Sequence, residues 1–195
     1  MTNETTFPTE THREVRRRRI AAGDARTALI RRHYGAPIAD VWDACTSPER
    51  LRRWLSPVSG DLRVGGTFQM EGNAHGEILR CEPPRLLAVT WVYGDRPADE
   101  VELRLRADDD GGTVLELEHA SVAEHAPMTI DGRPVDAILG VGIGWEMPLT
   151  YSLDLHLRGT PPAAPTSERA AEFEAVAAQL AQAWASLIDA SAGSR

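Results

Sequence analysis

Residues 100–119 read EVELRLRADDDGGTVLELEH, and this stretch decides the fold class. Apolar and charged side chains alternate over 100–107, an acidic turn with two glycines follows, and the alternation resumes over 113–119. Successive side chains of a strand point to opposite faces, so the pattern predicts an antiparallel hairpin with one apolar and one solvated face. The predicted apolar face comprises Val101, Leu103, Leu105, Leu115, Leu117 and, by alternation, His119.

Further strands are predicted just before this hairpin. Turns rich in glycine or proline separate alternating or β-forming segments at 61–64, 67–71, 74–81 and 86–93. Short strands at this spacing indicate an antiparallel sheet with one wet face. The side chains expected on its inner face include Phe68, Met70, Leu87, Val89, Trp91 and Tyr93.

An N-terminal hairpin is predicted from 15–20 and 27–34, joined by a turn at 21–25. Its first strand contains four consecutive arginines, Arg16–Arg19. Charge on an edge strand discourages aggregation, so we expect this strand at the edge of the sheet. Such a run also fits anion or nucleic-acid binding, but the acidic chain as a whole disfavours the second.

Two short helices are predicted after the strand at 27–34. Apolar residues recur at helical spacing over 38–46. Ser47 is then a suitable N-cap for a second helix that begins at Pro48. The apolar face of this second helix is expected to be Leu51, Trp54 and Leu55.

The C-terminal third predicts two more helices. Residues 120–136 are expected to form a loop, and 159–166 (GTPPAAPT) a linker. Between them a long helix is predicted, with Pro148 as a kink or in its first turn. The apolar residues of the segment 167–191 recur at helical spacing and form one stripe on a helix. This stripe predicts that the helix packs on its own domain or on another subunit. The long helix is marked by Trp145, Leu149, Leu153 and Leu157.

The order of these elements predicts an α+β fold. No strand–helix–strand alternation occurs, which excludes a doubly wound parallel sheet. The expected organisation is a disordered tail at 1–14, one domain at 15–158, a linker at 159–166 and an appended amphipathic helix at 167–191.

Composition and charge limit the possible functions. The chain has 195 residues, 42% of them hydrophobic and 26% charged, which suits one large globular domain. Its net charge of −8 disfavours nucleic acid. No apolar run approaches the roughly 20 residues of a membrane span, and the N-terminus lacks the apolar core of a secretion signal. We therefore expect a cytoplasmic protein without a membrane partner, in which Cys45 and Cys81 are buried free thiols.

Several short motifs, in order, resemble one known family. They are RHYGAP at 32–37, VW at 41–42, TSPE at 46–49, LRRW at 51–54, DLRVGGTF at 61–68, GEIL at 76–79, PPRL at 83–86, TW at 90–91, GT at 112–113 and GW at 144–145. Through them residues 26–158 resemble the proteins named for the activator of the ninety-kilodalton heat-shock chaperone's ATPase. The resemblance implies the helix-grip (START-like, SRPBCC) fold, in which a curved antiparallel sheet wraps a long C-terminal helix around an apolar cavity.

The same resemblance does not imply one activity. Relatives bind lipids, sterols, polyketides or plant hormones, and the superfamily includes carriers, sensors, cyclases and co-chaperones. A fold does not by itself define a function.

The candidate ligand-binding residues are those expected to face the cavity. Three tryptophans fall on inward positions of different elements, and such aromatics are typical of small-molecule sites, although they can also simply fill a core. His119 is expected to orient a polar end of the ligand, or else to be a satisfied histidine at a strand end. The sequence thus predicts non-enzymatic binding of a small hydrophobic molecule. The predicted set is Trp54, Phe68, Trp91, Leu103, Leu117, His119, Trp145, Leu149 and Leu153.

Two other functions stay open. His75 and Glu77 share a strand face and could serve acid–base chemistry in a cyclase or hydrolase, unless Gly76 and Ile78 point inward instead. A chaperone-regulator-like protein would bind a protein partner through its outer surface or C-terminal helix, and that helix could also join a homodimer.

Glycine and histidine patterns do not predict a cofactor. Gly140–Gly144 (GVGIG) is not the dinucleotide-binding pattern, so we expect a flexible lead-in that lets the long helix lie close to the sheet, or a gate for ligand. The histidines form neither H-E-x-x-H nor a helical i, i+4 pair, so no metal or other cofactor is expected. No serine or cysteine lies in a recognisable nucleophile motif.

Overall fold

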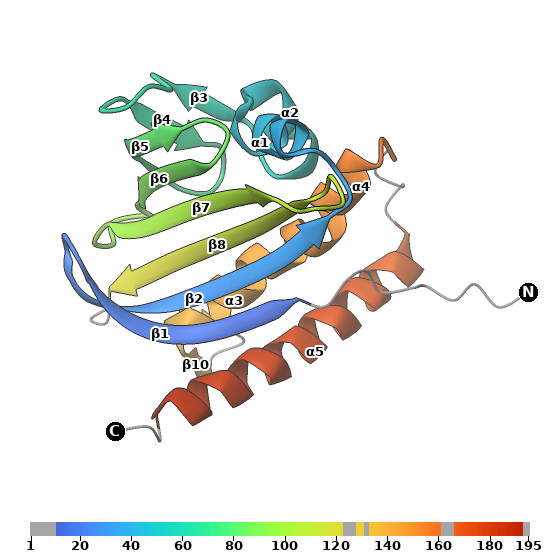
Figure 1. Cartoon of the computed structure of the whole chain (residues 1–195). Coiled ribbons are helices and arrows are strands. Elements are labelled where there is room, and N and C mark those ends of the chain that lie inside the picture. The colour runs from blue at the N-terminus through green and yellow to red at the C-terminus, as the bar shows by residue number, and fades with distance from the viewer. Residues whose placement is uncertain (1–10, 123–127, 131–132, 161–165, 193–195) are drawn as a thin grey trace, which may run out of the picture.

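A curved antiparallel sheet is the frame of the molecule (Figure 1). The computed structural model describes residues 11–122, 128–130, 133–160 and 166–192. Within these residues the main sheet has eight strands in the order β1-β2-β8-β7-β6-β5-β4-β3. The strands are β1 (His12–Ile20), β2 (Gly23–Tyr34), β3 (Val58–Gly60), β4 (Thr67–Met70), β5 (His75–Glu82), β6 (Leu86–Trp91), β7 (Asp99–Ala107) and β8 (Thr113–Val122).

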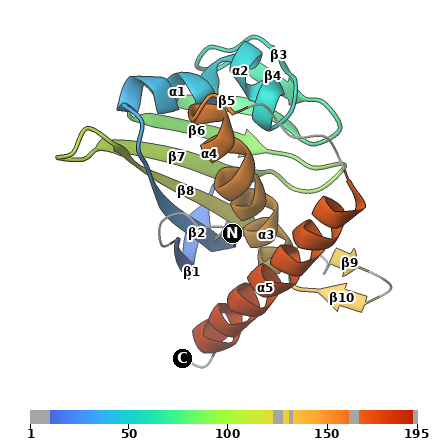
Figure 2. The same ribbon diagram turned by 90° about the vertical axis from the view of Figure 1, so that its right-hand side faces the viewer.

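The helices complete the fold that the sequence predicts. Two short ones follow β2, a long one crosses the sheet, and a last one packs outside it (Figure 2). This confirms the predicted α+β helix-grip architecture. The elements are α1 (Ile38–Thr46), α2 (Pro48–Trp54), the long helix made of α3 (Ala137–Met147), the π-helical turn η1 (Pro148–Leu153) and α4 (Asp154–Leu157), then α5 (Ser167–Ala192), and a small hairpin of β9 (Met128–Ile130) and β10 (Arg133–Val135).

The central hairpin forms as its alternation predicts. Leu103 lies opposite Leu117, and both are buried on the helix-covered face. On the outer face Glu102 lies opposite Glu118, a like-charge pair that is unfavourable on its own. Arg18 of β1 donates one hydrogen bond to Glu118 of β8 (2.7 Å) and another to Glu100 of β7 (3.0 Å). The arginine run on the predicted edge strand therefore offsets the acidic outer face of the sheet.

The predicted strand at 61–64 is wrong. The segment forms a tight turn after β3, in which the Arg63 amide donates to the Asp61 carbonyl (2.9 Å) and the Gly66 amide to the Arg63 carbonyl (2.8 Å). Glycine is required here because a Cβ on Gly66 would lie 2.1 Å from the Asp61 carbonyl oxygen. Side-chain alternation alone does not reveal that close approach of two backbones.

The boundaries at the two ends of the sheet also differ from the prediction. β1 begins at His12, which pairs with Arg31, so the predicted tail at 1–14 is too long; residues 1–10 lie outside the described residues. β8 continues to Val122, inside the expected loop, because β2 offers partners along its whole length.

The long helix departs from its prediction at two points. Gly140–Gly144 lies inside α3 and is not a flexible lead-in. Gly142 does permit a close approach, but of α5 and not of the sheet, since a Cβ there would lie 2.4 Å from the ring of Trp184. Pro148 does not lie in the first turn of the long helix, the second of its two predicted positions, but at the point where α3 ends and η1 begins. It has no N–H for the carbonyl four residues earlier, and the backbone widens into the π-helical turn before continuing.

One buried carboxylate joins α5 to the rest of the chain. Glu146 is 1% exposed and accepts hydrogen bonds from Trp184 Nε1 (2.9 Å), Arg13 Nε (2.7 Å) and Arg13 Nη2 (2.5 Å). The Trp184 side chain is fully buried. The apolar stripe of the appended helix thus packs on α3 and β1 of its own chain.

We expect two alanine substitutions in α3 to have opposite effects. Gly142→Ala should destabilise the protein by about 1–3 kcal/mol, because its methyl group overlaps Trp184 in a filled interface. Gly144→Ala meets no atom within 4 Å and should stabilise it by about 0.5–1 kcal/mol through helix propensity. Urea unfolding of both variants measures this. Equal free energies of unfolding would contradict the close packing of α5 on Gly142.

Candidate functional site

Two adjoining chambers lie between the sheet and the long helix. The apolar chamber, of about 160 Å³, is bounded by α1, α2, η1 and the inner face of the sheet. The polar chamber, of about 180 Å³, is bounded by α3 and the segment that joins β6 to β7. Four residues line both chambers and form a shared wall: Leu55, Met70, Trp91 and Trp145.

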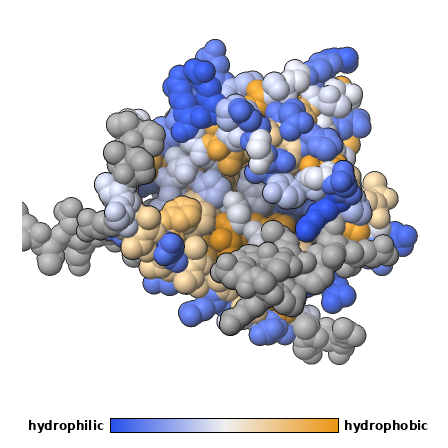
Figure 3. Space-filling model, turned by 180° about the vertical axis from the view of Figure 1, so that it is seen from behind, coloured by the Kyte–Doolittle hydropathy of each residue, from blue (hydrophilic) through white to orange (hydrophobic). Residues whose placement is uncertain are grey.

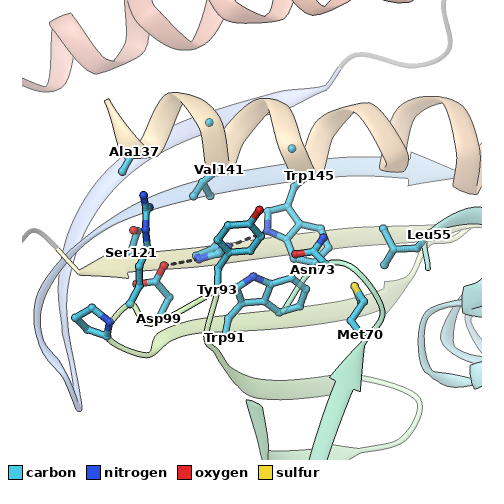
Figure 4. A pocket seen from close by; sticks show the side chains of 15 residues that line it. Leu55, Met70, Asn73, Trp91, Tyr93, Asp99, Ser121, Ala137, Val141 and Trp145 are labelled. Atoms are coloured by element: carbon cyan, nitrogen blue, oxygen red, sulfur yellow. Dashed lines mark hydrogen bonds and ion pairs between the residues drawn. The ribbon is translucent and has the colours of Figure 1, made fainter. Parts of the chain in front are cut away.

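Two indole rings form the centre of the shared wall. Trp145 projects from α3 toward Trp91 of β6 (Figure 4), with ring centroids 5.0 Å apart and planes inclined by 58°. Phe68 extends the cluster on the apolar side, with its ring 5.9 Å from that of Trp91. Tilted pairs of this kind add attraction beyond simple burial, so the wall is a packed aromatic unit.

A chain of hydrogen bonds holds one of these indoles. Trp145 Nε1 donates to Nδ1 of His119 (2.9 Å), and Nε2 of His119 donates to the carboxylate of Asp99 (3.0 Å). The other oxygen of Asp99 accepts from the Val122 amide (2.9 Å). His119 is 4% exposed, so the chain lies in a low-dielectric setting where satisfied networks rigidify a structure.

The structure brings eight of the nine predicted ligand residues to the two chambers. Leu153 is the exception. It is fully buried but lines neither chamber, because the apolar chamber reaches along this helix only as far as Leu149. The apolar chamber is lined by Trp54, Phe68, Leu103, Leu117 and Leu149, the polar chamber by His119, and both by Trp91 and Trp145.

Sequence reasoning missed two buried polar residues of the polar chamber, Asp99 and Ser121. In each strand every second residue points inward, and these two residues are the next inward positions: Asp99 precedes Val101, and Ser121 follows His119. That period was the signal that could have found them. Polar residues at strand ends are also typical of turns, so the period alone does not distinguish the two.

The acid–base pair considered from the sequence lies outside the chambers. His75 and Glu77 are both exposed, whereas Gly76 and Ile78 of the same strand are buried. Neither His75 nor Glu77 lines the apolar or the polar chamber. The strand therefore presents its small and apolar residues inward, as the alternative assignment of its faces allowed.

The two cysteines differ, which corrects the expectation of two buried thiols. Cys81 is exposed, and Cys45 is only partly exposed. Removal from water raises the pKa of the Cys45 thiol to about 12. Both border the apolar chamber.

The described residues contain no group of three or more His, Cys, Asp or Glu side chains placed to hold a metal ion. None of the described helices has both the length and the hydropathy to cross a membrane.

In the view from behind, apolar residues reach the surface near the middle of the molecule, among hydrophilic ones (Figure 3).

Comparison with known proteins gives one family. Residues 35–154 match the family described as Activator of Hsp90 ATPase homolog 1-like protein. A crystal structure of CalU16 from Micromonospora echinospora is 44% identical, covers 91% of this chain and 98% of its own, and has a TM-score of 0.76. A solution structure of the same protein is 42% identical, covers 96% of this chain and 100% of its own, and has a TM-score of 0.79.

A more distant solved structure has the same fold. The protein encoded by gene BPP1335 from Bordetella parapertussis is 26% identical, covers 92% of this chain and 94% of its own, and has a TM-score of 0.60. Among curated proteins, none matches this sequence.

The hydrogen-bond chain predicts the tautomer of His119. Because Nδ1 accepts from Trp145 and Nε2 donates to Asp99, the neutral ring should carry its proton on Nε2. Long-range ¹⁵N–¹H correlation spectra at neutral pH measure this directly. His75, which is exposed, should show the averaged pattern of a free ring and serves as the internal control. A proton found on Nδ1 of His119 would contradict the described site.

The thiols should react at different rates. Iodoacetamide at pH 8 should modify Cys81 and leave Cys45 intact, because a thiol whose pKa is near 12 holds almost no thiolate at that pH. Peptide mass spectrometry locates the label. In the control Cys81→Ser, native protein should stay unlabelled and urea-unfolded protein should take up one label. Equal labelling of both native thiols would show that Cys45 is not shielded from water.

Proposed function

We propose that this chain, which belongs to the Activator of Hsp90 ATPase homolog 1-like family, binds a small hydrophobic molecule in its two chambers. The observation that carries the proposal is the pair of adjoining chambers with one aromatic wall. Small-molecule sites are concave and mostly apolar, with a few placed polar groups. The apolar chamber supplies the hydrophobic surface, and the polar chamber supplies the few polar groups.

Binding is favoured over acid–base catalysis by the state of the histidines. Both ring nitrogens of His119 are engaged, one as an acceptor and one as a donor, so no lone pair is free to take a proton from a ligand. His75, the other candidate base, faces solvent. The polar groups of the site are therefore suited to orienting a molecule.

The sizes of the chambers limit the ligand. A cavity of about 150 Å³ lined by aliphatic and aromatic side chains holds a molecule of one ring, such as benzene. The apolar chamber, of about 160 Å³, is of that size. Only the two chambers together reach the roughly 300 Å³ at which sites for larger small molecules begin.

A neutral dye tests the proposal. N-phenyl-1-naphthylamine fluoresces in apolar surroundings, and titration into the wild-type protein should give a saturable signal. Leu103→Trp fills part of the apolar chamber and should weaken this binding by about tenfold or more, since it replaces ligand volume by a side chain.

The matched control is Leu79→Trp, the same change at a more exposed position on β5, which β6 separates from β7. It should leave dye affinity unchanged, and circular dichroism should verify that both variants are folded. No saturable binding to the wild type, or equal losses in both variants, would contradict binding in the chambers.

A further inference from the structure

We infer that the ligand is an elongated, acidic amphipathic molecule that spans both chambers, with its anionic group held by Arg96 and Ser121. This inference rests on the proposed function and adds the chemical class of the ligand. It comes from the polar groups of the polar chamber that the protein itself leaves unused.

Arg96 is the first of these unused groups. It lies in the segment between β6 and β7, is half-buried and lines the polar chamber. Several other arginines, such as Arg18 and Arg31, pair with glutamates of the sheet. Among the residues that the structure describes, no carboxylate pairs with Arg96. Its fork of N–H donors is therefore available to a ligand.

Ser121 is the second. Its side chain lines the same chamber (Figure 4) and the residue is 3% exposed, yet within the described chain its hydroxyl has no hydrogen-bond partner. Buried polar groups in native proteins nearly always have a partner. Among the described residues the side-chain atoms shut off from solvent without a partner are on Thr27, Arg32 and Thr150, so the Ser121 hydroxyl is instead reached from the chamber and can bond a group that enters it.

Asp99, the acid within the chamber, forms no ion pair with Arg96 among the described residues. Both oxygens of Asp99 already accept hydrogen bonds, from Val122 and His119. The indole N–H of Trp145 is likewise used, by His119. What remains is the guanidinium of Arg96 and the hydroxyl of Ser121, together with the side chains of Asn73 and Tyr93, which also line the chamber. All four can donate hydrogen bonds, and a carboxylate or another acidic oxygen group is the chemistry that a guanidinium among such donors recognises.

The shape of the site gives the rest of the ligand. The apolar chamber offers no charged side chain, so the body of the molecule must be apolar. The two chambers meet at the shared wall, so a molecule that spans both would lie against the indoles of Trp91 and Trp145, which offer ring faces and edges. The aliphatic members of that wall, Leu55 and Met70, have rotatable side chains, and methionine adapts readily to a passing ligand.

A matched pair of dyes tests the inference. N-phenyl-1-naphthylamine and 1-anilinonaphthalene-8-sulfonate share one three-ring body, and only the second carries an anionic group. Wild-type protein should bind the sulfonate more tightly than the neutral dye. Arg96→Gln should weaken sulfonate binding by about tenfold, the size of one hydrogen bond to a charged group, and leave the neutral dye within about twofold. Ser121→Ala should weaken the sulfonate by a smaller factor in the same selective way.

The control is Arg106→Gln, which makes the same charge change at an exposed arginine on the outer face of β7. It should alter neither dye. Unchanged sulfonate binding in Arg96→Gln, or equal losses in Arg96→Gln and Arg106→Gln, would overturn the assignment of an anion site. Because the neutral dye reports the proposed function separately, its failure to bind wild-type protein would instead refute binding in the chambers. Neutral-dye binding by each variant also shows that the variant is folded.

Discussion

The buried carboxylate of Glu146 is the constraint on which the rest of the structure depends. An isolated carboxylate at 1% exposure would cost several kcal/mol, so its partners must be in place before α3 can lie where it does. Those partners come from opposite ends of the chain, Arg13 in β1 and Trp184 in α5. Trp184 reaches the carboxylate because Gly142 has no side chain to block it. The edge strand, the long helix and the appended helix are thus one packed unit.

The position of the aromatic wall follows from that unit. Consecutive residues of an α-helix point about 100° apart, so directing Glu146 toward β1 and α5 turns Trp145 toward the sheet. Nδ1 of His119, on the sheet, then accepts a hydrogen bond from the indole N–H of Trp145. With Trp145 fixed at both its backbone and its ring, the wall is preformed. Under the proposed function, a preformed wall would lower the ordering cost of binding.

The limits of sequence reasoning are physical. Alternation predicted β4 to β8, and helical spacing with a cap residue predicted α1 and α2, because these patterns arise from local burial. The same reasoning failed where the backbone or a side chain is packed closely at a position without a side chain. The turn at 61–64 depends on the close approach of Gly66 to the Asp61 carbonyl within one short segment, and the position of Gly142 depends on Trp184 of another helix. The alternation of apolar and polar residues encodes neither contact.

Within the site the same division holds. The wall tryptophans could be predicted, since each lies on an apolar period. That Leu153 lies beyond the chamber could not, because it depends on where the helix passes the curved sheet. The alternation of the strands places Asp99 and Ser121 at inward positions, so their burial could be predicted. The sequence does not say which buried polar group has a hydrogen-bond partner.

That difference between partnered and unpartnered groups is the organising feature of the polar chamber. Ser121 lies on the strand next to that of Asp99, but it is not the partner of this carboxylate. The Asp99 carboxylate accepts hydrogen bonds from the Val122 amide and from His119. One set of polar groups is therefore bonded within the protein and fixes the position of Trp145. The other set, Arg96 and Ser121, stays open. Under the proposed function, this separation would leave Arg96 and Ser121 available to a ligand although a buried acid lies in the same chamber.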